Sequence, residues 1–112
     1  MTKREINKVI KAAGKLDWNT TYYGGEFEFS KYSPAGQDFN ISVSAGTTDE
    51  LQREIRERHN NFDCSAEAYL WLDNTGHGTN GAPYDMKDVY EDMGECEKML
   101  GELADEIMSM AA

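Results

Sequence analysis

The sequence predicts a single α+β domain, residues 1–112, in which an N-terminal helix precedes a two- or three-stranded antiparallel meander and three helices then cover the sheet. Three observations predict this fold. Apolar residues recur at spacings of three and four near the N-terminus, alternate with polar residues in the middle, and return to helical spacing from residue 47 onward. A chain of 112 residues also suits one domain with one modest core.

The first expected element is a helix over residues 2–14. Its apolar positions, spaced by three and four residues, are Ile6, Val9, Ile10 and Ala13. This spacing places them on one face of a helix, and Gly14 follows as a typical helix end.

The middle of the chain predicts the sheet. Residues 26–32 and 38–44 alternate apolar and polar side chains, which is typical of strands with one buried face. The apolar members are Phe27, Phe29, Phe39, Ile41 and Val43. Residues 33–37 supply proline and glycine for the turn, and residues 19–23 can add an earlier strand. A two-stranded ribbon alone is marginal in water, so we expect helices over its apolar face.

Three helices are predicted after the sheet. The first, residues 47–60, begins with Thr47 and a glutamate three residues later, the pattern of a capping box. The second covers residues 64–73. The third runs from Asp85 to about Met110 and carries the strongest pattern in the chain.

That pattern is an apolar seam with alternating spacings of three and four residues. Its members are Met86, Val89, Met93, Cys96, Leu100, Leu103, Ile107 and Met110. Two interpretations stay open: the seam packs against the sheet and the other helices, or a second copy shares it. The protein is accordingly expected to be a monomer or a homodimer. Either interpretation makes Cys96 a core thiol rather than a reactive one.

The net charge of −10 is unevenly distributed. Residues 1–15 hold five basic residues against Glu5 alone, a charge of +4, whereas the other 97 residues hold 6 basic and 20 acidic residues, a charge of −14. Phosphates would be repelled by such a surface, so we expect no direct binding of nucleic acid through it. A basic protein surface would attract it. The alternative is that the acidity only keeps the protein soluble.

The sequence also predicts a cytoplasmic protein. No apolar run approaches the roughly 18 residues of a membrane span, and the basic N-terminal segment has no apolar core of a secretory signal. In a reducing cytoplasm a disulfide between Cys64 and Cys96 is not expected.

Residues 76–81, Gly-His-Gly-Thr-Asn-Gly, match the G-x-G-x-x-G pattern of dinucleotide-binding loops. That function requires a preceding strand and a helix that opens within the loop. Here a predicted helix precedes the loop, and Pro83 follows it. We therefore interpret the segment as a connector between helices, with Asn74, His77 and Asn80 as polar contacts if the loop touches a partner.

Metal binding and catalysis have little support in the sequence. His59, Cys64, His77 and Cys96 could make a tetrahedral zinc site, but they lack the local C-x-x-C spacing of such sites. Cys64 near a helix N-terminus would have a lowered pKa, yet no spacing supports a Cys-His pair. No catalytic residue is assigned. We expect neither an enzyme nor a cofactor, with zinc as the alternative.

Carboxylates beside the apolar seam form the candidate partner-binding surface, here called the acidic strip. Its members are Asp85, Asp88, Glu91, Asp92, Glu95, Glu102, Asp105 and Glu106. The helix rises about 31 Å over this length at roughly 1.5 Å per residue. With Glu97, nine carboxylates share it, about one per 3.5 Å, near the roughly 3.4 Å spacing of phosphates along a DNA strand. Only Lys87 and Lys98 oppose them, although like charges four residues apart destabilise a helix by about 0.2–0.5 kcal/mol per pair. We interpret the acidic strip as a docking surface or a nucleic-acid mimic. The alternative is a helix face that is merely solvated.

In size, in its helix–meander–helices plan and in the segment DMKDVYEDMGECEKMLGELADEI, the chain resembles the small acidic proteins of phages and mobile elements that block bacterial defence, the anti-CRISPR and antirestriction proteins. In that group, acidic members occupy the DNA-reading surface of a nuclease in place of nucleic acid, while others bind elsewhere. The resemblance implies an inhibitor in the bacterial host cytoplasm that docks the acidic strip on a basic groove of a CRISPR or restriction nuclease, as a DNA mimic or otherwise. The alternatives are a small zinc-binding protein and a dimeric regulatory or structural protein.

Overall fold

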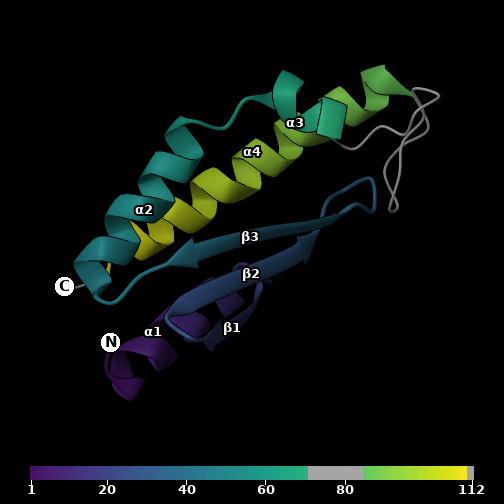
Figure 1. The fold of residues 1–112 in the computed structure, drawn as a ribbon. Helices are drawn as coiled ribbons and strands as arrows, with labels where there is room; N and C mark the ends of the chain where they lie inside the picture. The colour runs from purple at the N-terminus through teal and green to yellow at the C-terminus, as the bar shows by residue number, and fades with distance from the viewer. Residues whose placement is uncertain (71–84, 111–112) are drawn as a thin grey trace.

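The computed structural model describes residues 1–70 and 85–110, and Figure 1 shows their arrangement. The elements follow in the order α1 (Lys3–Gly14), β1 (Asn19–Tyr23), β2 (Glu26–Tyr32), β3 (Asp38–Ser44), α2 (Thr48–Asn60), α3 (Cys64–Leu70) and α4 (Met86–Met108). The predicted α+β class and its order of elements are confirmed, with three strands in the meander. The predicted extension of the second post-sheet helix to residue 73, and the loop 76–81 with His77, lie outside the described residues.

The sheet is antiparallel, in the order β1-β2-β3, with the central strand pairing on both sides. Phe29 of β2 lies opposite Ile41 of β3 and Thr20 of β1. Phe27 and Phe29 are fully buried, whereas the alternate side chains of β2 and β3 are mostly exposed. The period of two therefore divides the sheet into one apolar and one polar face.

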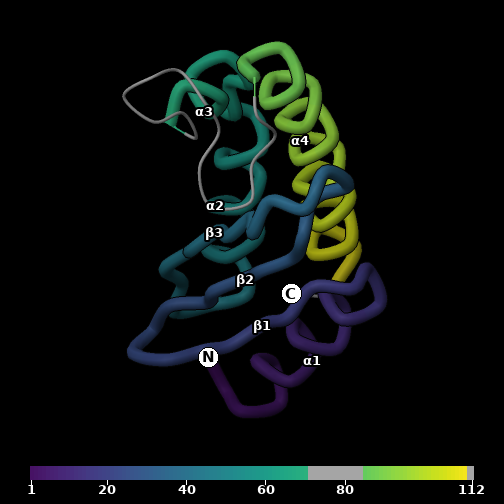
Figure 2. The backbone as a smooth tube through the Cα atoms, turned by 90° about the vertical axis from the view of Figure 1, so that its right-hand side faces the viewer, coloured from purple at the N-terminus to yellow at the C-terminus, as the bar shows by residue number. Residues whose placement is uncertain are grey.

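The helices lie in one layer on the apolar face. α4 runs along the sheet, with α2 on the side of β3 and α1 on the side of β1 (Figures 1 and 2). α3 packs against the first half of α4. In residues 1–70 and 85–110, no element covers the polar face of the sheet. The core thus lies between two layers, and the molecule is elongated, with extents of 46 × 23 × 22 Å.

α1 begins at an N-cap that the sequence interpretation missed. The Thr2 hydroxyl accepts a hydrogen bond from the Glu5 amide at 3.1 Å, and the Thr2 amide donates to the Glu5 carboxylate at 3.1 Å, which completes a capping box. The Thr48 hydroxyl donates to the same carboxylate at 2.9 Å. The Thr2 amide first, and then the two hydroxyls, hold the pKa of Glu5 below its usual value. The helix ends at Gly14, as expected, but Asp17 takes the left-handed turn conformation, with a φ of 67°.

The apolar seam of α4 packs within the chain. Its central members, from Val89 to Ile107, are buried, and Met86 and Met110 are partly buried against the same core. The first interpretation of the seam is confirmed, because the sheet and helices of the same molecule occupy it. Met99 and Ala104 are buried as well and widen the seam beyond the heptad pattern.

Candidate functional site

The acidic strip lies on α4, which has 23 residues and is therefore about 34 Å long. The helix begins where Asp85 caps it, because the Asp85 carboxylate accepts a hydrogen bond from the Asp88 amide at 3.1 Å. Asp85 is exposed, but part of its role is this cap.

Five members of the strip form one exposed surface, here called the carboxylate face. They are Asp88, Glu91, Glu95, Glu102 and Asp105, all exposed. At 3.6 residues per turn these positions fall within about 100° of the helix circumference, on the side turned away from the buried seam. Lys98 approaches the face and pairs with Glu95 at 3.2 Å. Lys87 is also exposed within this arc, so the face combines five carboxylates with two lysines and carries a net charge of −3.

The prediction that Asp92 belongs to the exposed acidic strip is wrong. It is 4% exposed, and its carboxylate accepts hydrogen bonds from the Ser33 hydroxyl, the Gln37 side-chain amide and, at 3.1 Å, the Ala35 backbone amide. These donors all belong to the turn between β2 and β3, residues 33–37. Helical spacing placed Asp92 beside Asp88, but the turn folds over that position. Asp92 therefore ties the hairpin to α4 and is not available to a partner.

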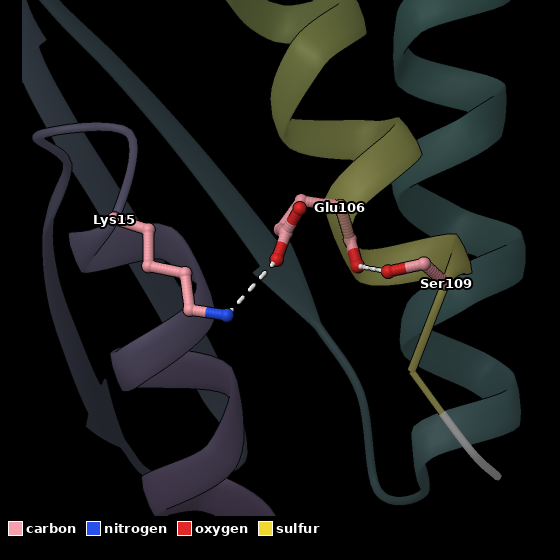
Figure 3. Close-up of polar contacts among 3 residues, drawn as sticks. All are labelled: Lys15, Glu106 and Ser109. Atoms are coloured by element: carbon pink, nitrogen blue, oxygen red, sulfur yellow. Dashed lines mark hydrogen bonds and ion pairs between the residues drawn. The ribbon is translucent and has the colours of Figure 1, made fainter.

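Glu106 also departs from the strip. It is half-buried, and one of its carboxylate oxygens lies 3.6 Å from the Lys15 ammonium at the end of α1. Figure 3 shows this ion pair, together with the Ser109 hydroxyl that donates to the Glu106 backbone carbonyl at 2.7 Å. Glu106 thus connects α1 to the C-terminal end of α4.

The hairpin turn and the first half of α4 enclose an open groove of about 550 Å³. Its lining residues are Pro34, Ala35, Asp88, Glu91, Asp92 and Glu95. One wall is the turn, and the other is the N-terminal half of the carboxylate face. Because Asp92 holds the turn in place, the width of this groove depends on its hydrogen bonds.

Three of the four residues considered for zinc, His59, Cys64 and Cys96, lie in the described part of the chain, and each has another role there. The ring of His59 packs against Gly101 of α4, where an added Cβ would lie 2.9 Å from the ring nitrogen Nε2. The Cys64 thiol donates to the Glu97 carboxylate at 3.0 Å, and Cys96 is buried in the core. In the described residues no group of three or more His, Cys, Asp or Glu side chains could hold a metal ion, and His77 lies outside them.

The expectation of a lowered Cys64 pKa is wrong. Burial first, and then the hydrogen bond and negative charge of Glu97, raise the pKa of the Cys64 thiol to about 11. Asp63 stands at the N-terminal end of α3, where its carboxylate accepts from the Ser65 and Ala66 amides and adds further negative charge. Burial likewise raises the pKa of Cys96 to about 12. Neither thiol is activated as a nucleophile.

We expect the two thiols to react slowly with Ellman's reagent at pH 8 in the folded protein and at ordinary rates in urea. Only the thiolate attacks, so each unit by which the pKa is raised lowers the reactive fraction about tenfold. Glu97→Gln removes the negative charge next to Cys64 and should accelerate its reaction, while Glu95→Gln, on the exposed side, should not. A folded-state rate for Cys64 equal to that of a free thiol would contradict this account.

The polar face of the sheet is a feature that the search for sites in the sequence missed. Its exposed side chains include Glu26, Glu28 and Asp38, with Tyr23 at 90% and Tyr32 at 71% exposure. The signal was present in the alternation of residues 26–44, which marks the polar positions as clearly as the apolar ones.

The class of this protein is defined by its fold and its site alone. No family model, no curated protein and no solved structure matches the chain. The class is an α+β domain in which one helical layer covers a three-stranded antiparallel meander and the longest described helix displays the carboxylate face. Within the described residues, every helix is too short or too polar to cross a membrane.

Proposed function

We propose that this protein acts by binding, and that it inhibits a nucleic-acid-handling protein by docking the carboxylate face on a basic groove of that protein. The observation that carries the proposal is the exposure of five carboxylates on one side of α4. From Asp88 to Asp105 they extend about 26 Å along the helix. A basic groove shaped for a nucleic-acid strand offers complementary charge over such a length.

The corrected strip favours docking over a close copy of DNA. Without Asp92 and Glu106, the helix offers about one carboxylate per 5 Å, whereas phosphates along one DNA strand are spaced by roughly 3.4 Å. The carboxylates therefore cannot replace phosphates one for one. The groove beside the hairpin turn gives the partner a shaped feature in addition to charge, which is a source of specificity that a uniform row of charges lacks.

A purely solvated face explains this arrangement less well. Glu91 and Glu95 are four residues apart, and Asp88 and Glu91 are three apart, so neighbouring carboxylates repel one another. Only Lys87 and Lys98 are interleaved with the carboxylates of this helix face, and further lysines would give the same solubility without that cost. Bacterial defence nucleases, of the CRISPR or restriction type, are the targets that we propose, in the cytoplasm of a bacterial host, and inhibition there requires no catalytic group of this chain.

Reversing Asp88, Glu91 and Glu102 to lysine is expected to weaken binding to the target nuclease on the order of 100-fold. Each reversed contact should cost about 1 kcal/mol, and about 2.7 kcal/mol corresponds to 100-fold. The loss should shrink as salt is raised, because the contacts are screened. Binding is measured by interferometry against nucleases captured from a bacterial lysate by the wild-type protein.

The matched control reverses Glu26, Glu28 and Asp38 on the polar face of the sheet, which changes the net charge by the same amount. We expect its binding to stay within about threefold of the wild type. Equal losses of affinity in both variants would show that only net charge matters. An unchanged affinity of the α4 variant would exclude the carboxylate face as the docking surface.

A further inference from the structure

The outer face of α1 carries positive charge in an otherwise acidic protein. Lys3, Arg4, Lys8 and Lys11 are exposed and, with Asn7, line a shallow groove of about 470 Å³. We call these four cations the basic face. They fall within about 140° of the helix circumference, on the side away from the buried Val9, Ala12 and Ala13.

The charge of the basic face is not neutralised by the described part of the chain. The ion pairs there are Lys15–Glu106, Arg53–Glu54 and Lys98–Glu95, and none includes a member of the basic face. Glu5, the only acid of α1, is engaged by Thr2 and Thr48. Among the residues that the structure describes, Lys15 is therefore the one basic residue of the first fifteen that pairs with a carboxylate.

α1 presents these cations from a fixed backbone. The capping box of Thr2 and Glu5 holds its first turn, the Thr48 hydroxyl joins that turn to α2, and Lys15 joins its last turn to α4 (Figure 3). Val9 and Ala13 are fully buried beneath it. Apart from the partly exposed Ile10, the apolar residues of the helix pack into the core, so the basic face offers little apolar surface to insert into a lipid bilayer.

The basic face and the acidic groove lie at different ends of the molecule, whereas Glu102 and Asp105 of the carboxylate face lie nearer α1. Figure 1 shows α1 beside the C-terminal end of α4, away from the β2–β3 turn, which forms one wall of the acidic groove. From Glu106, which contacts α1, back to Asp88 the helix rises about 27 Å. The Debye length is about 8 Å at physiological salt, so the acidic groove repels an anion at α1 only weakly. The net charge of −10 therefore does not exclude local binding of an anion.

We propose that the basic face binds the phosphate backbone of nucleic acid. Lys3 to Lys11 rises about 12 Å, which gives about one cation per 3 Å, close to the roughly 3.4 Å spacing of phosphates along a strand. The preference for nucleic acid over an acidic protein rests on the proposed function, because nucleic acid is the polyanion that the target holds. The carboxylate face would then occupy the basic groove of the target, while α1 contacts nucleic acid that the target holds outside that groove. This proposal revises the expectation of no nucleic-acid binding, which treated the surface as uniformly acidic.

The test measures the fluorescence anisotropy of a labelled 20-nucleotide DNA strand titrated with the protein at 25 to 200 mM salt. Binding should weaken with a slope of log K against log salt of about −2 to −3, as expected for three or four phosphate contacts on a single strand. Reversing Lys3, Arg4, Lys8 and Lys11 to glutamate should reduce affinity at least about tenfold at 50 mM salt. The same four positions changed to glutamine should give a smaller loss in the same direction, and circular dichroism checks that both variants fold.

The matched control reverses Arg53, Arg56, Lys87 and Lys98, four exposed cations elsewhere, and should bind within about threefold of the wild type. Absence of binding at 25 mM salt, or equal losses in both reversed proteins, would overturn the proposal. Competition by polyglutamate or by phosphatidylserine vesicles as strong as that of unlabelled DNA would overturn it in favour of an acidic protein or a membrane. The carboxylate-face variant should retain DNA binding, so failure of one proposal is distinguishable from failure of the other.

Discussion

Replacing Asp92 by alanine is expected to lower the free energy of unfolding by about 3 kcal/mol, and the melting temperature by about 10 °C or more. The buried carboxylate accepts three hydrogen bonds from the β2–β3 turn. Its removal leaves the Ser33, Ala35 and Gln37 donors without their acceptor. Hydrogen bonds to a charged group are stronger than neutral ones, and stranded buried donors carry a desolvation penalty. Urea denaturation followed by circular dichroism measures the loss.

Asp88→Ala is the matched control, one turn earlier on the exposed side of the same helix. It should change stability by less than about 0.5 kcal/mol. Asp92→Asn should restore little, because an amide NH₂ would replace one acceptor and face a donor. Equal stabilities of the Asp92→Ala and Asp88→Ala proteins would show that the tie between turn and helix is not a stabilising feature.

Replacing Phe29 by alanine is expected to cost about 4 kcal/mol, the largest single effect in the chain. The ring is fully buried in the central strand, where it lies parallel to that of Phe27 with centroids 5.9 Å apart. Its cross-strand neighbours are Ile41 and Thr20, and the helical layer closes over it. Truncation removes apolar area from the middle of the core and leaves a cavity that the paired strands cannot close.

Tyr32→Ala tests the other face of the same strand. Tyr32 is 71% exposed, so its truncation should change the free energy of unfolding by less than about 0.5 kcal/mol. Both variants are compared by urea denaturation. A large loss on truncating Tyr32 would indicate that something packs on the polar face of the sheet, and the two-layer description would then be incomplete.

Local patterns in the sequence were sufficient to predict the elements of the fold. Alternation in residues 26–44 identified the two longer strands and the face that each buries, and the spacing of the seam identified α4 and its buried side. The capping box predicted at Thr47 was confirmed in part: its hydroxyl accepts from the Glu50 amide at 3.1 Å, but the Thr47 amide does not donate to the Glu50 carboxylate. Such features depend on residues close together along the chain, so the sequence alone contains the necessary information.

The predictions that are wrong concern side chains at which distant segments of the chain meet. Asp92 lies at the boundary between the seam and the carboxylate face, and its spacing fits both; only the turn at residues 33–37, far away in sequence, decides that it is buried. The lowered pKa predicted for Cys64 is wrong for the same reason, because burial in the folded chain first, and then Glu97 of α4, raise it. No local pattern reports which side chain a tertiary contact will bring to a given position.

The tie between Asp92 and the hairpin has a consequence for the order of events during synthesis. The turn leaves the ribosome 55 residues before its partner, a delay of about 3 to 11 seconds at 5–20 residues per second. For that interval the meander exists without the helix that covers Phe27 and Phe29, while its other face already displays carboxylates. The charged positions of β2 would then discourage nascent sheets from adhering to one another. The acidic groove itself is completed last. Chains truncated before α4 should therefore be prone to aggregation and unable to dock on the basic groove of the target protein.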